Sequence, residues 1–329
     1  MDKDVLERFE RIENEIKNNF GWLNYRIDDL VYEKILLEKK VEHNYFRSLT
    51  EDELIYELKR WYYLLLGKKL DLENPVTFNE KIQWLKIYDH NPLKRELADK
   101  VKARDYIEHN IGKQYLIPEI GVYDYFDQID FRCFPNQFVL KCNHGSGWNE
   151  IIRDKDKIDL PKVKRNFDYW MSLDYAYYFG FEMQYKNIER KILVERYIEQ
   201  LDGNLFDYKI HCFMGVPQII QVIGDREAHN CRAKQAFYNI DWKRLDIDCG
   251  VHMQYKYDLP KPSKLDELLK VAERLSKPFQ YVRIDLYEIE EQVKFGEFTF
   301  TPNSGVYQWN PQELDILWGS GYASAYKQC

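Results

Sequence analysis

Seven short apolar runs between residues 138 and 300 have the length and composition of β-strands. They are rich in Val, Ile, Phe and Tyr, and short connections at 214–217 and 288–293 join two pairs of them in the manner of hairpins. The runs are Phe138–Cys142, Lys191–Ile198, Phe206–Phe213, Gln218–Ile223, Arg232–Tyr238, Gln280–Tyr287 and Lys294–Phe300. Because hairpins are mixed with helices and no regular strand–helix–strand alternation occurs, the sequence predicts an α+β fold.

Helical patterns precede and interrupt these strands. Thr77 and Glu80 have the spacing of a capping box, so we expect a helix over Glu80–Tyr88. We expect further helices over Pro92–Asn110 and Leu265–Leu275. We therefore divide the chain into an amphipathic helix at 1–45, a mostly helical region at 46–136 and a region at 137–329 that carries the chemistry.

The first 45 residues repeat apolar side chains in steps of three and four. The stripe comprises Val5, Phe9, Ile12, Ile16, Phe20, Leu23, Ile27 and Leu30. This spacing is typical of an amphipathic helix, with one departure from a strict heptad near Gly21. Two interpretations remain, a coiled coil and a helix folded against its own domain. We favour the coiled coil, which would make the protein a homo-oligomer through residues 1–45.

Composition excludes several classes of protein. The chain has 48 basic and 55 acidic residues, a net charge of −7, which argues against a nucleic-acid partner. No apolar run approaches the ~18 residues of a membrane span, and the charged amino terminus does not resemble a signal peptide. The six cysteines show no metal-ligand spacing and no disulfide framework. We expect a cytoplasmic protein.

A lysine and a glycine-containing loop follow one another at 141–147. Lys141 lies near the end of a predicted buried strand, and the next residues include Gly145, Ser146 and Gly147. Glycine is scarce, 15 of 329 residues, so this pair is informative. Glycine lets backbone N–H groups approach an anion, and an ammonium adds charge, so the segment is a candidate phosphate site. An ordinary turn beside a surface lysine is the alternative.

Two consecutive strands carry a second candidate group. Arg283 and Asp285 share one face of the first strand, and Glu297 and Thr299 share one face of the next. Two facing carboxylates would repel unless a cation lay between them, and Mg²⁺ prefers oxygen ligands. The alternative is a solvated outer face.

A third segment is informative only beside the other two. Glu195–Ile198 ends one predicted strand, and Asp207, Lys209 and His211 share a face of the next. An extended backbone with carboxylates nearby could bind a purine and its ribose.

In this order the motifs resemble the ATP-grasp superfamily, and most closely its TupA-like branch, named for teichuronopeptide biosynthesis. The resemblance runs from about Asn74 to Gly321. It rests on the segments Asn74–Lys86, Ala98–Arg104, Leu140–Gly147, Glu195–Ile198, Asp207–Lys209 and Val282–Pro302.

The resemblance implies that ATP lies between two α+β subdomains. Lys141 would contact the α- and β-phosphates, and the loop after it would close over them. That loop comprises His144, Gly145, Ser146 and Gly147. A hinge whose backbone binds adenine would comprise Glu195, Arg196, Tyr197 and Ile198. Asp207 would lie near the ribose.

The same resemblance implies the catalytic residues. Lys209 would approach the γ-phosphate, Asp285 and Glu297 would bind Mg²⁺, and Arg283 would stabilise the anionic intermediate. The superfamily usually has an E-x-N metal motif, whereas this chain has Thr299 at the third position. The third metal ligand is therefore either Thr299 or Asn303.

The function implied is an ATP-dependent carboxylate–amine ligase that forms an amide through an acyl phosphate. Its partners would be an amine and a carboxylate, either a small molecule or a sugar nucleotide such as a nucleotide-linked uronate, in capsular polysaccharide biosynthesis. Two alternatives remain. One is a glycosyltransferase that binds metal through Asp246 and Asp248, and the other is a non-catalytic nucleotide-binding interaction protein.

Overall fold

The computed structural model describes residues 30–198, 205–225 and 233–321. The chain divides into two compact units, residues 1–49 and residues 50–329. In the described part of the first unit, residues 30–48 form a helix. Seven of the eight apolar positions that predicted the coiled coil precede residue 30, outside the described residues, so self-association stays a prediction.

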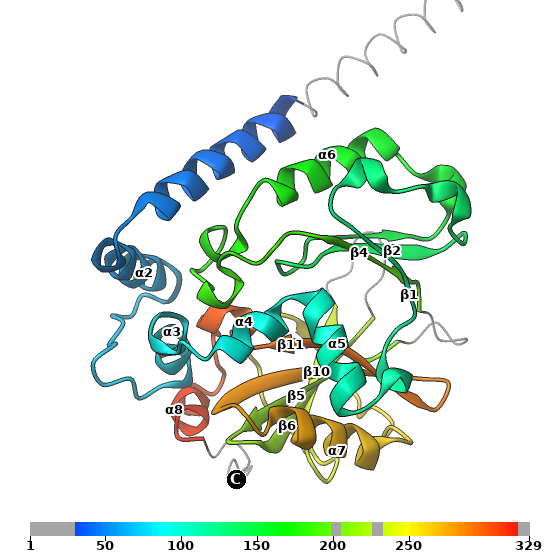
Figure 1. The fold of residues 1–329 in the computed structure, drawn as a ribbon. Coiled ribbons are helices and arrows are strands. Elements are labelled where there is room, and N and C mark those ends of the chain that lie inside the picture. The colour runs from blue at the N-terminus through cyan, green and yellow to red at the C-terminus, as the bar shows by residue number, and fades with distance from the viewer. Residues whose placement is uncertain (1–29, 199–204, 226–232, 322–329) are drawn as a thin grey trace, which may run out of the picture. The chain divides into compact units, whose positions relative to one another are not determined.

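The described strands of the second unit form two antiparallel sheets, apart from one parallel pairing (Figure 1). The smaller sheet has the order β1-β4-β2-β3, and the larger sheet has the order β11-β10-β5-β6-β7-β8, with β9 paired to β7. The small-sheet strands are β1 (Glu119–Tyr123), β2 (Phe138–Cys142), β3 (Asn149–Ile152) and β4 (Ile192–Arg196). The large-sheet strands are β5 (Asp207–Phe213), β6 (Val216–Gly224), β7 (Lys234–Asn239), β8 (Arg244–Leu245), β9 (Met253–Gln254), β10 (Tyr281–Ile289) and β11 (Gln292–Thr299).

All seven predicted strands are present, with ends shifted by at most two residues. The sequence did not indicate the short strands β1, β3, β8 and β9. Of these, β1 lies inside the region expected to be mostly helical, and it pairs with β4. The α+β prediction is confirmed.

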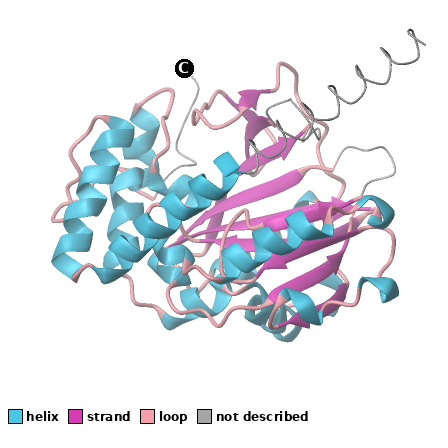
Figure 2. Ribbon diagram, turned by 90° about the horizontal axis from the view of Figure 1, so that it is seen from above, coloured by secondary structure: helices cyan, strands magenta, loops and turns pink. Residues whose placement is uncertain are grey.

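Helices cover both sheets, as Figure 2 shows. They are α2 (Glu51–Leu66), α3 (Phe78–Tyr88), α4 (Pro92–Ala98), α5 (Lys100–Asn110), α6 (Leu160–Met171), α7 (Leu265–Ser276) and α8 (Glu313–Gly319). The capping box at Thr77 is confirmed, because its side chain accepts from Glu80 N while the Glu80 carboxylate accepts from Thr77 N. No helix in the described residues has the length and apolar character required to cross a bilayer.

The single helix predicted over Pro92–Asn110 is wrong, because the chain breaks at Asp99. This residue is extended (φ −74°, ψ 112°), and its carboxylate accepts hydrogen bonds from the first-turn N–H groups of α5, Val101 N at 2.9 Å and Lys102 N at 3.5 Å. A side chain that caps a helix in this way starts a new helix and ends the preceding one.

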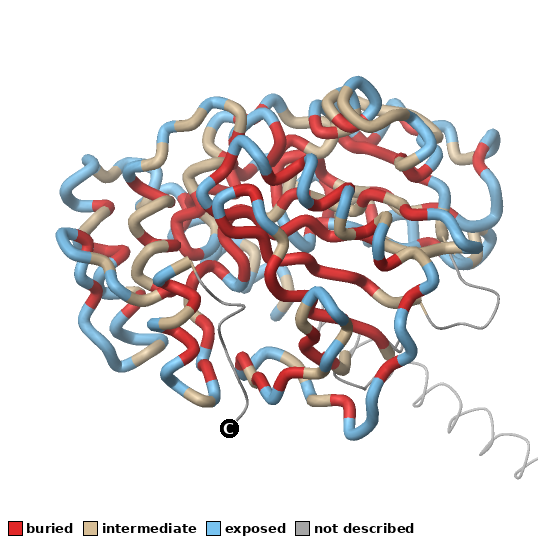
Figure 3. The backbone as a smooth tube through the Cα atoms, turned by 90° about the horizontal axis from the view of Figure 1, so that it is seen from below, coloured by how far each residue is buried: buried red, intermediate tan, exposed pale blue. Residues whose placement is uncertain are grey.

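Apolar side chains form a core on each sheet. Phe167 of α6 packs with Phe138 and Leu140 of the small sheet. Leu268 and Val271 of α7 pack with the large sheet. In Figure 3 the buried backbone runs along these strands, with exposed segments around them. The two cores hold the sheets as separate layers, and the candidate site lies where residues of both sheets meet.

Candidate functional site

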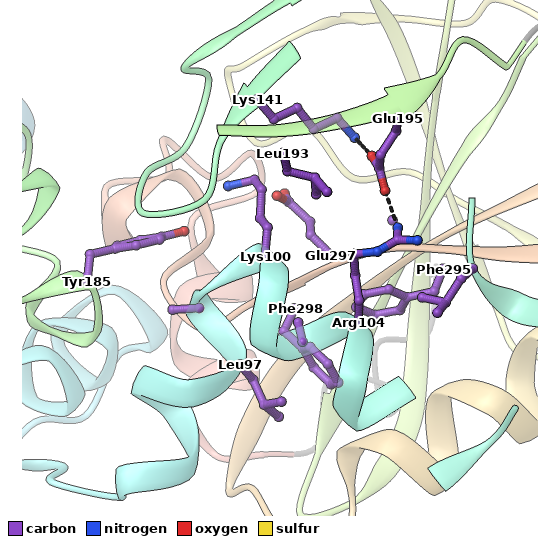
Figure 4. A pocket seen from close by; sticks show the side chains of 14 residues that line it. Leu97, Lys100, Arg104, Lys141, Tyr185, Leu193, Glu195, Phe295, Glu297 and Phe298 are labelled. Atoms are coloured by element: carbon purple, nitrogen blue, oxygen red, sulfur yellow. Dashed lines mark hydrogen bonds and ion pairs between the residues drawn. The ribbon is translucent and has the colours of Figure 1, made fainter. Parts of the chain in front are cut away.

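A recess is lined by residues of both sheets and of the helix pair α4–α5 (Figure 4). The space between these residues is about 460 Å³ when the part open to solvent is included. Its polar lining residues are Lys100 and Arg104 of α5, Lys141 of β2, Glu195 of β4, Glu297 of β11, and Tyr185. The recess therefore combines three cations with two carboxylates.

Glu195 binds two of those cations from different elements. Lys141 Nζ lies 2.6 Å from Glu195 Oε2, and Arg104 Nη1 donates to Glu195 Oε1. The two strands place these side chains together, because Val139 is the register partner of Glu195 and Lys141 lies two residues further along β2. Glu195 is buried, so the two cations compensate the cost of desolvating its charge.

Packing determines the shape of the loop after β2. A Cβ atom on Gly145 would come within 2.6 Å of the Trp148 ring and 2.7 Å of the Tyr175 ring, so glycine is required there. Gly147 has φ +73°, a conformation that favours glycine. Lys100 Nζ donates to the Gly145 carbonyl, and Ser146 and Gly147 are exposed. The exposed backbone beside two lysines is the part of this loop that could bind an anion.

The His144 ring does not face that exposed backbone. It is buried, its Nε2 lies 3.2 Å from the Trp170 carbonyl oxygen, and its ring packs edge-on against Trp148. Burial lowers the pKa of His144 to about 4. A neutral, enclosed imidazole packs within the loop, and the closing of His144 over the phosphates stays a prediction.

The register of β5, β10 and β11 brings the predicted catalytic residues into one row. Lys209 pairs with Asp285, and Asp285 pairs with Glu297. In the neighbouring pair, Arg283 lies opposite Thr299. The sequence could not establish that the two strand faces coincide, and the structure shows that they do.

Asp285 is the centre of this row. Arg283 donates to both of its carboxylate oxygens, each at 2.7 Å, and Lys209 Nζ donates to Oδ2. Burial alone would raise the pKa of Asp285, but Arg283 and Lys209 outweigh it and lower the pKa to about 2. Lys209 also lies 2.8 Å from Asp207 Oδ2, which places the predicted ribose contact at the edge of the same row.

The donor set of the row suits Mg²⁺ only together with a ligand's oxygens. In the described residues, no three His, Cys, Asp or Glu side chains form a group that could bind a metal ion. Glu297 is 35% exposed and Thr299 Oγ1 donates to its Oε1 at 3.2 Å. Two carboxylates and a hydroxyl are all oxygen donors, and Mg²⁺ is usually held by one or two carboxylates plus phosphates. Asn303 is exposed and donates to Val306 O within its own turn.

Most predicted site residues, among them the hinge residues after Glu195, do not line the recess. Arg196 is exposed, and Tyr197 accepts a hydrogen bond from Arg153 Nε at 3.3 Å. Ile198 is the last described residue before the gap at 199–204. The backbone role predicted for these three residues stays a prediction.

Asp248, one of the two aspartates of the alternative glycosyltransferase site, shapes a turn. Asp248 Oδ1 accepts from Gly250 N at 2.9 Å and from Gln254 Nε2 at 3.2 Å. Asp248 also forms a backbone bridge with Asn310, and Asp246 is exposed.

The described cysteines, Cys133, Cys142, Cys212 and Cys249, are free thiols.

Sequence reasoning assigned no role to three residues that line the recess, Lys100, Arg104 and Tyr185. The first two belong to the Ala98–Arg104 segment, whose three cations at the start of a helix are an available signal. Burial lowers the pKa of Lys100, and nearby Glu297 opposes the shift. Nothing in the sequence around Tyr185 distinguishes it from the other tyrosines.

Comparison with solved structures finds ATP-grasp proteins. A D-alanine–D-alanine ligase from Helicobacter pylori is 14% identical, with a TM-score of 0.41, over 76% of this chain and 69% of that chain. The ATP complex of the Bacillus anthracis D-alanine–D-alanine ligase is 14% identical, with a TM-score of 0.35, over 62% of this chain and 54% of that chain. The present chain thus spans about half of the Bacillus anthracis enzyme. A RimK domain ATP-grasp protein from Sphaerobacter thermophilus is 13% identical, with a TM-score of 0.37, over 70% and 66% of the two chains.

The family assignment comes from the sequence. No curated protein matches the chain. Residues 80–322 match the family described as TupA-like ATPgrasp, which covers most of the region where the motifs resemble that branch. The motif order, the α+β fold and this match agree, and the chain belongs to the TupA-like ATP-grasp family.

Proposed function

We propose that this protein is an ATP-dependent carboxylate–amine ligase that forms an amide through an acyl phosphate. One observation carries the proposal: Lys209, Asp285 and Glu297 form a continuous row across three strands, beside Arg283. Membership of the ATP-grasp family supports ATP as the phosphoryl donor.

The nucleotide would occupy the recess. Lys100, whose ammonium group donates to the Gly145 carbonyl, and Lys141, whose ammonium group binds Glu195, would neutralise the α- and β-phosphates. The backbone after Glu195 would bind adenine, and Asp207 would bind the ribose. Because Lys141 is paired with Glu195 in the structure, phosphate binding would exchange one anionic partner of this lysine for another.

The row on β5, β10 and β11 would hold the reacting groups. Lys209 would contact the γ-phosphate, Arg283 the oxyanion of the tetrahedral intermediate, and Glu297, Asp285 and Thr299 the metal. Mg²⁺ bound there would neutralise charge on the phosphates. Both oxygens of Asp285 are engaged by cations, so Glu297 is the more available ligand. These residues position the reactants and stabilise charge.

Membership of the TupA-like branch supports the choice of substrates. The acid would be a uronic acid or a nucleotide-linked uronate, and an amine would complete the amide, in the synthesis of a cell-surface polysaccharide. The acid attacks the γ-phosphorus, so ADP leaves and an acyl phosphate forms. The amine then adds to the acyl carbon, and inorganic phosphate leaves with one oxygen of the original carboxylate.

An isotope experiment tests this mechanism. Uronic acids and nucleotide-linked uronates are screened with a panel of amines for ADP release, and the active acid is then labelled with ¹⁸O in its carboxylate. We expect one labelled oxygen in inorganic phosphate for each amide formed. A Lys209→Met variant should lose label transfer and amide formation together.

Three results would contradict the proposal. Formation of AMP and pyrophosphate would indicate an adenylating enzyme. Label that stays out of phosphate would exclude the acyl phosphate. Binding of UDP-sugars in preference to ATP, measured by thermal shift with Mg²⁺, would favour the glycosyltransferase alternative.

A further inference from the structure

Tyr185 projects into the recess from a short 3₁₀ turn, η6 (Met183–Tyr185). The residue is only 8% exposed, and its ring packs edge-on against Tyr175 with 4.8 Å between the ring centroids. Figure 4 shows the hydroxyl directed toward Lys100 and Glu297. Packing therefore holds the ring, while the hydroxyl borders the open space.

In the described part of the chain, the Tyr185 hydroxyl makes no hydrogen bond with protein. The hydroxyl oxygen itself is accessible from the recess. Two other buried tyrosines have such a partner: the Tyr281 hydroxyl lies 2.8 Å from His211 Nδ1, and the Tyr238 hydroxyl accepts from Leu259 N at 2.7 Å. A mostly buried hydroxyl without a hydrogen-bond partner in the protein costs free energy unless a ligand or a water molecule bonds to it.

The surroundings define what such a ligand must offer. Burial raises the pKa of Tyr185 well above its usual value, and the carboxylates of Glu182 and Glu297 raise it further. The phenol therefore stays protonated and can donate to an anion. Lys100 lies beside it in the recess and would contribute positive charge. These two groups suit an oxyanion.

The position of Tyr185 along the recess indicates which oxyanion its hydroxyl would bind. In Figure 4 the pair of Glu195 and Arg104 lies on one side, and Tyr185 lies on the other, beyond Lys100 and Glu297. Glu297 is the register partner of Asp285, which binds Lys209. Tyr185 is thus on the side of Glu297, away from Glu195.

We propose that the Tyr185 hydroxyl donates a hydrogen bond to the terminal phosphate of bound ATP, so that this residue distinguishes ATP from ADP. The inference rests on the proposed function, since it assumes that the adenine of ATP lies at Glu195 and that the γ-phosphate lies at Lys209 and Glu297. The oxygens of the γ-phosphoryl group remain anionic throughout its transfer. The neutral Tyr185 hydroxyl can therefore donate a hydrogen bond to them both before and during the reaction.

Calorimetric titration of the full chain with MgATP and with MgADP tests the proposal directly. Removing a hydrogen bond to a charged acceptor weakens binding by about tenfold or more. Tyr185→Phe should therefore raise the Kd of MgATP by about tenfold and change the Kd of MgADP by less than about twofold. Tyr185→Leu should give the same selective loss.

Tyr208→Phe is the matched control. Tyr208 is 5% exposed, and its ring lies in the core of the large sheet near Trp242. This variant should bind both nucleotides as the parent does.

Each other outcome overturns the assignment. Equal weakening of MgATP and MgADP would place Tyr185 elsewhere on the nucleotide, and no change in either Kd would remove it from the site. If the parent protein binds neither nucleotide, the proposed function itself fails and the Tyr185 assignment fails with it. Thermal unfolding of each variant confirms that the comparison is made on folded protein.

Discussion

Asp285 and Glu297 face each other across β10 and β11, but their surroundings differ. Asp285 is 1% exposed and accepts from Arg283 and Lys209. The side chain of Glu297 is 35% exposed, and Arg283 Nη2 lies 3.8 Å from its Oε1. The first carboxylate therefore stabilises the fold as well as the site, whereas the second can be changed with little effect on the fold.

This difference predicts distinct outcomes for two conservative variants. Asp285→Asn removes the carboxylate that the buried cations Arg283 and Lys209 share, so we expect the free energy of unfolding to fall by about 3–5 kcal/mol. Glu297→Gln should change it by less than about 1 kcal/mol. Both variants should lose Mg²⁺-dependent ADP release, because both remove an anionic oxygen donor. Urea unfolding and a coupled ADP assay measure the two effects.

Glu290→Gln, at the exposed tip of the same hairpin, is the control and should match the parent in both assays. If Glu297→Gln retained turnover within a few-fold of the parent, the metal would have to bind elsewhere. Equal stability of the parent and Asp285→Asn would mean that the cations around Asp285 find other partners.

At the level of elements, sequence patterns predicted what depends on local periodicity. The strand β2 has the predicted bounds, because alternating apolar residues end at a turn. The hairpin of β10 and β11 was predicted from two strand patterns with a short connection. The break at Asp99 was missed, because the apolar pattern continues through it and only the cap interrupts the helix.

The candidate site was predictable in residue type, and less so in geometry. The facing of Asp285 and Glu297 depends on the strand register, which includes a bulge between Asp285 and Leu286. The pairing of Glu195 with Arg104 joins residues 91 positions apart, and no local pattern encodes it. The buried orientation of His144 depends on Trp148 and on the end of α6, both of which come later in the chain.

Asp99 connects the helix pair to the loop after β2. Its Oδ1 caps α5 and also accepts from Asn143 Nδ2 at 2.8 Å, and the next residue, Lys100, donates to the Gly145 carbonyl. Loss of the Asp99 side chain would therefore disturb both the start of α5 and the candidate phosphate loop.

We expect Asp99→Ala to lower the free energy of unfolding by about 2–3 kcal/mol, from a lost cap and an unpaired buried amide. It should also weaken MgATP binding, because the Asp99 side chain holds both the start of α5, which carries Lys100, and Asn143 of the loop. Asp99→Asn should retain most of the parent's stability and most of its MgATP affinity, since Asn is an equally good cap. Asp159→Ala removes the exposed cap of α6 as a control and should cost about 1 kcal/mol without affecting nucleotide binding. Unchanged nucleotide affinity in Asp99→Ala would show that the loop does not depend on this contact.

At the scale of the whole molecule, the first unit has a different character from the second. Its described helix, residues 30–48, carries apolar side chains that are between 48% and 69% exposed, and these are Leu30, Val31, Ile35, Leu37 and Val41. The second unit contains the apolar cores of both sheets and the whole candidate site. The stripe on residues 1–45 and these exposed side chains suit association with a second copy of the helix.

Deletion of residues 1–49 separates the roles of the two units. The deletion keeps Thr50, whose side chain accepts from Glu53 N and caps α2, so the second unit retains its first helix start. We expect the mass measured by light scattering to fall from an oligomer to a monomer, because the helix that would pair is gone. We expect MgATP affinity to stay within about twofold of the parent, because every residue assigned to the nucleotide lies after residue 98. A mass of one chain for both proteins would instead favour a helix that folds against its own domain, and loss of nucleotide binding in a folded truncation would show that the first unit supports the site.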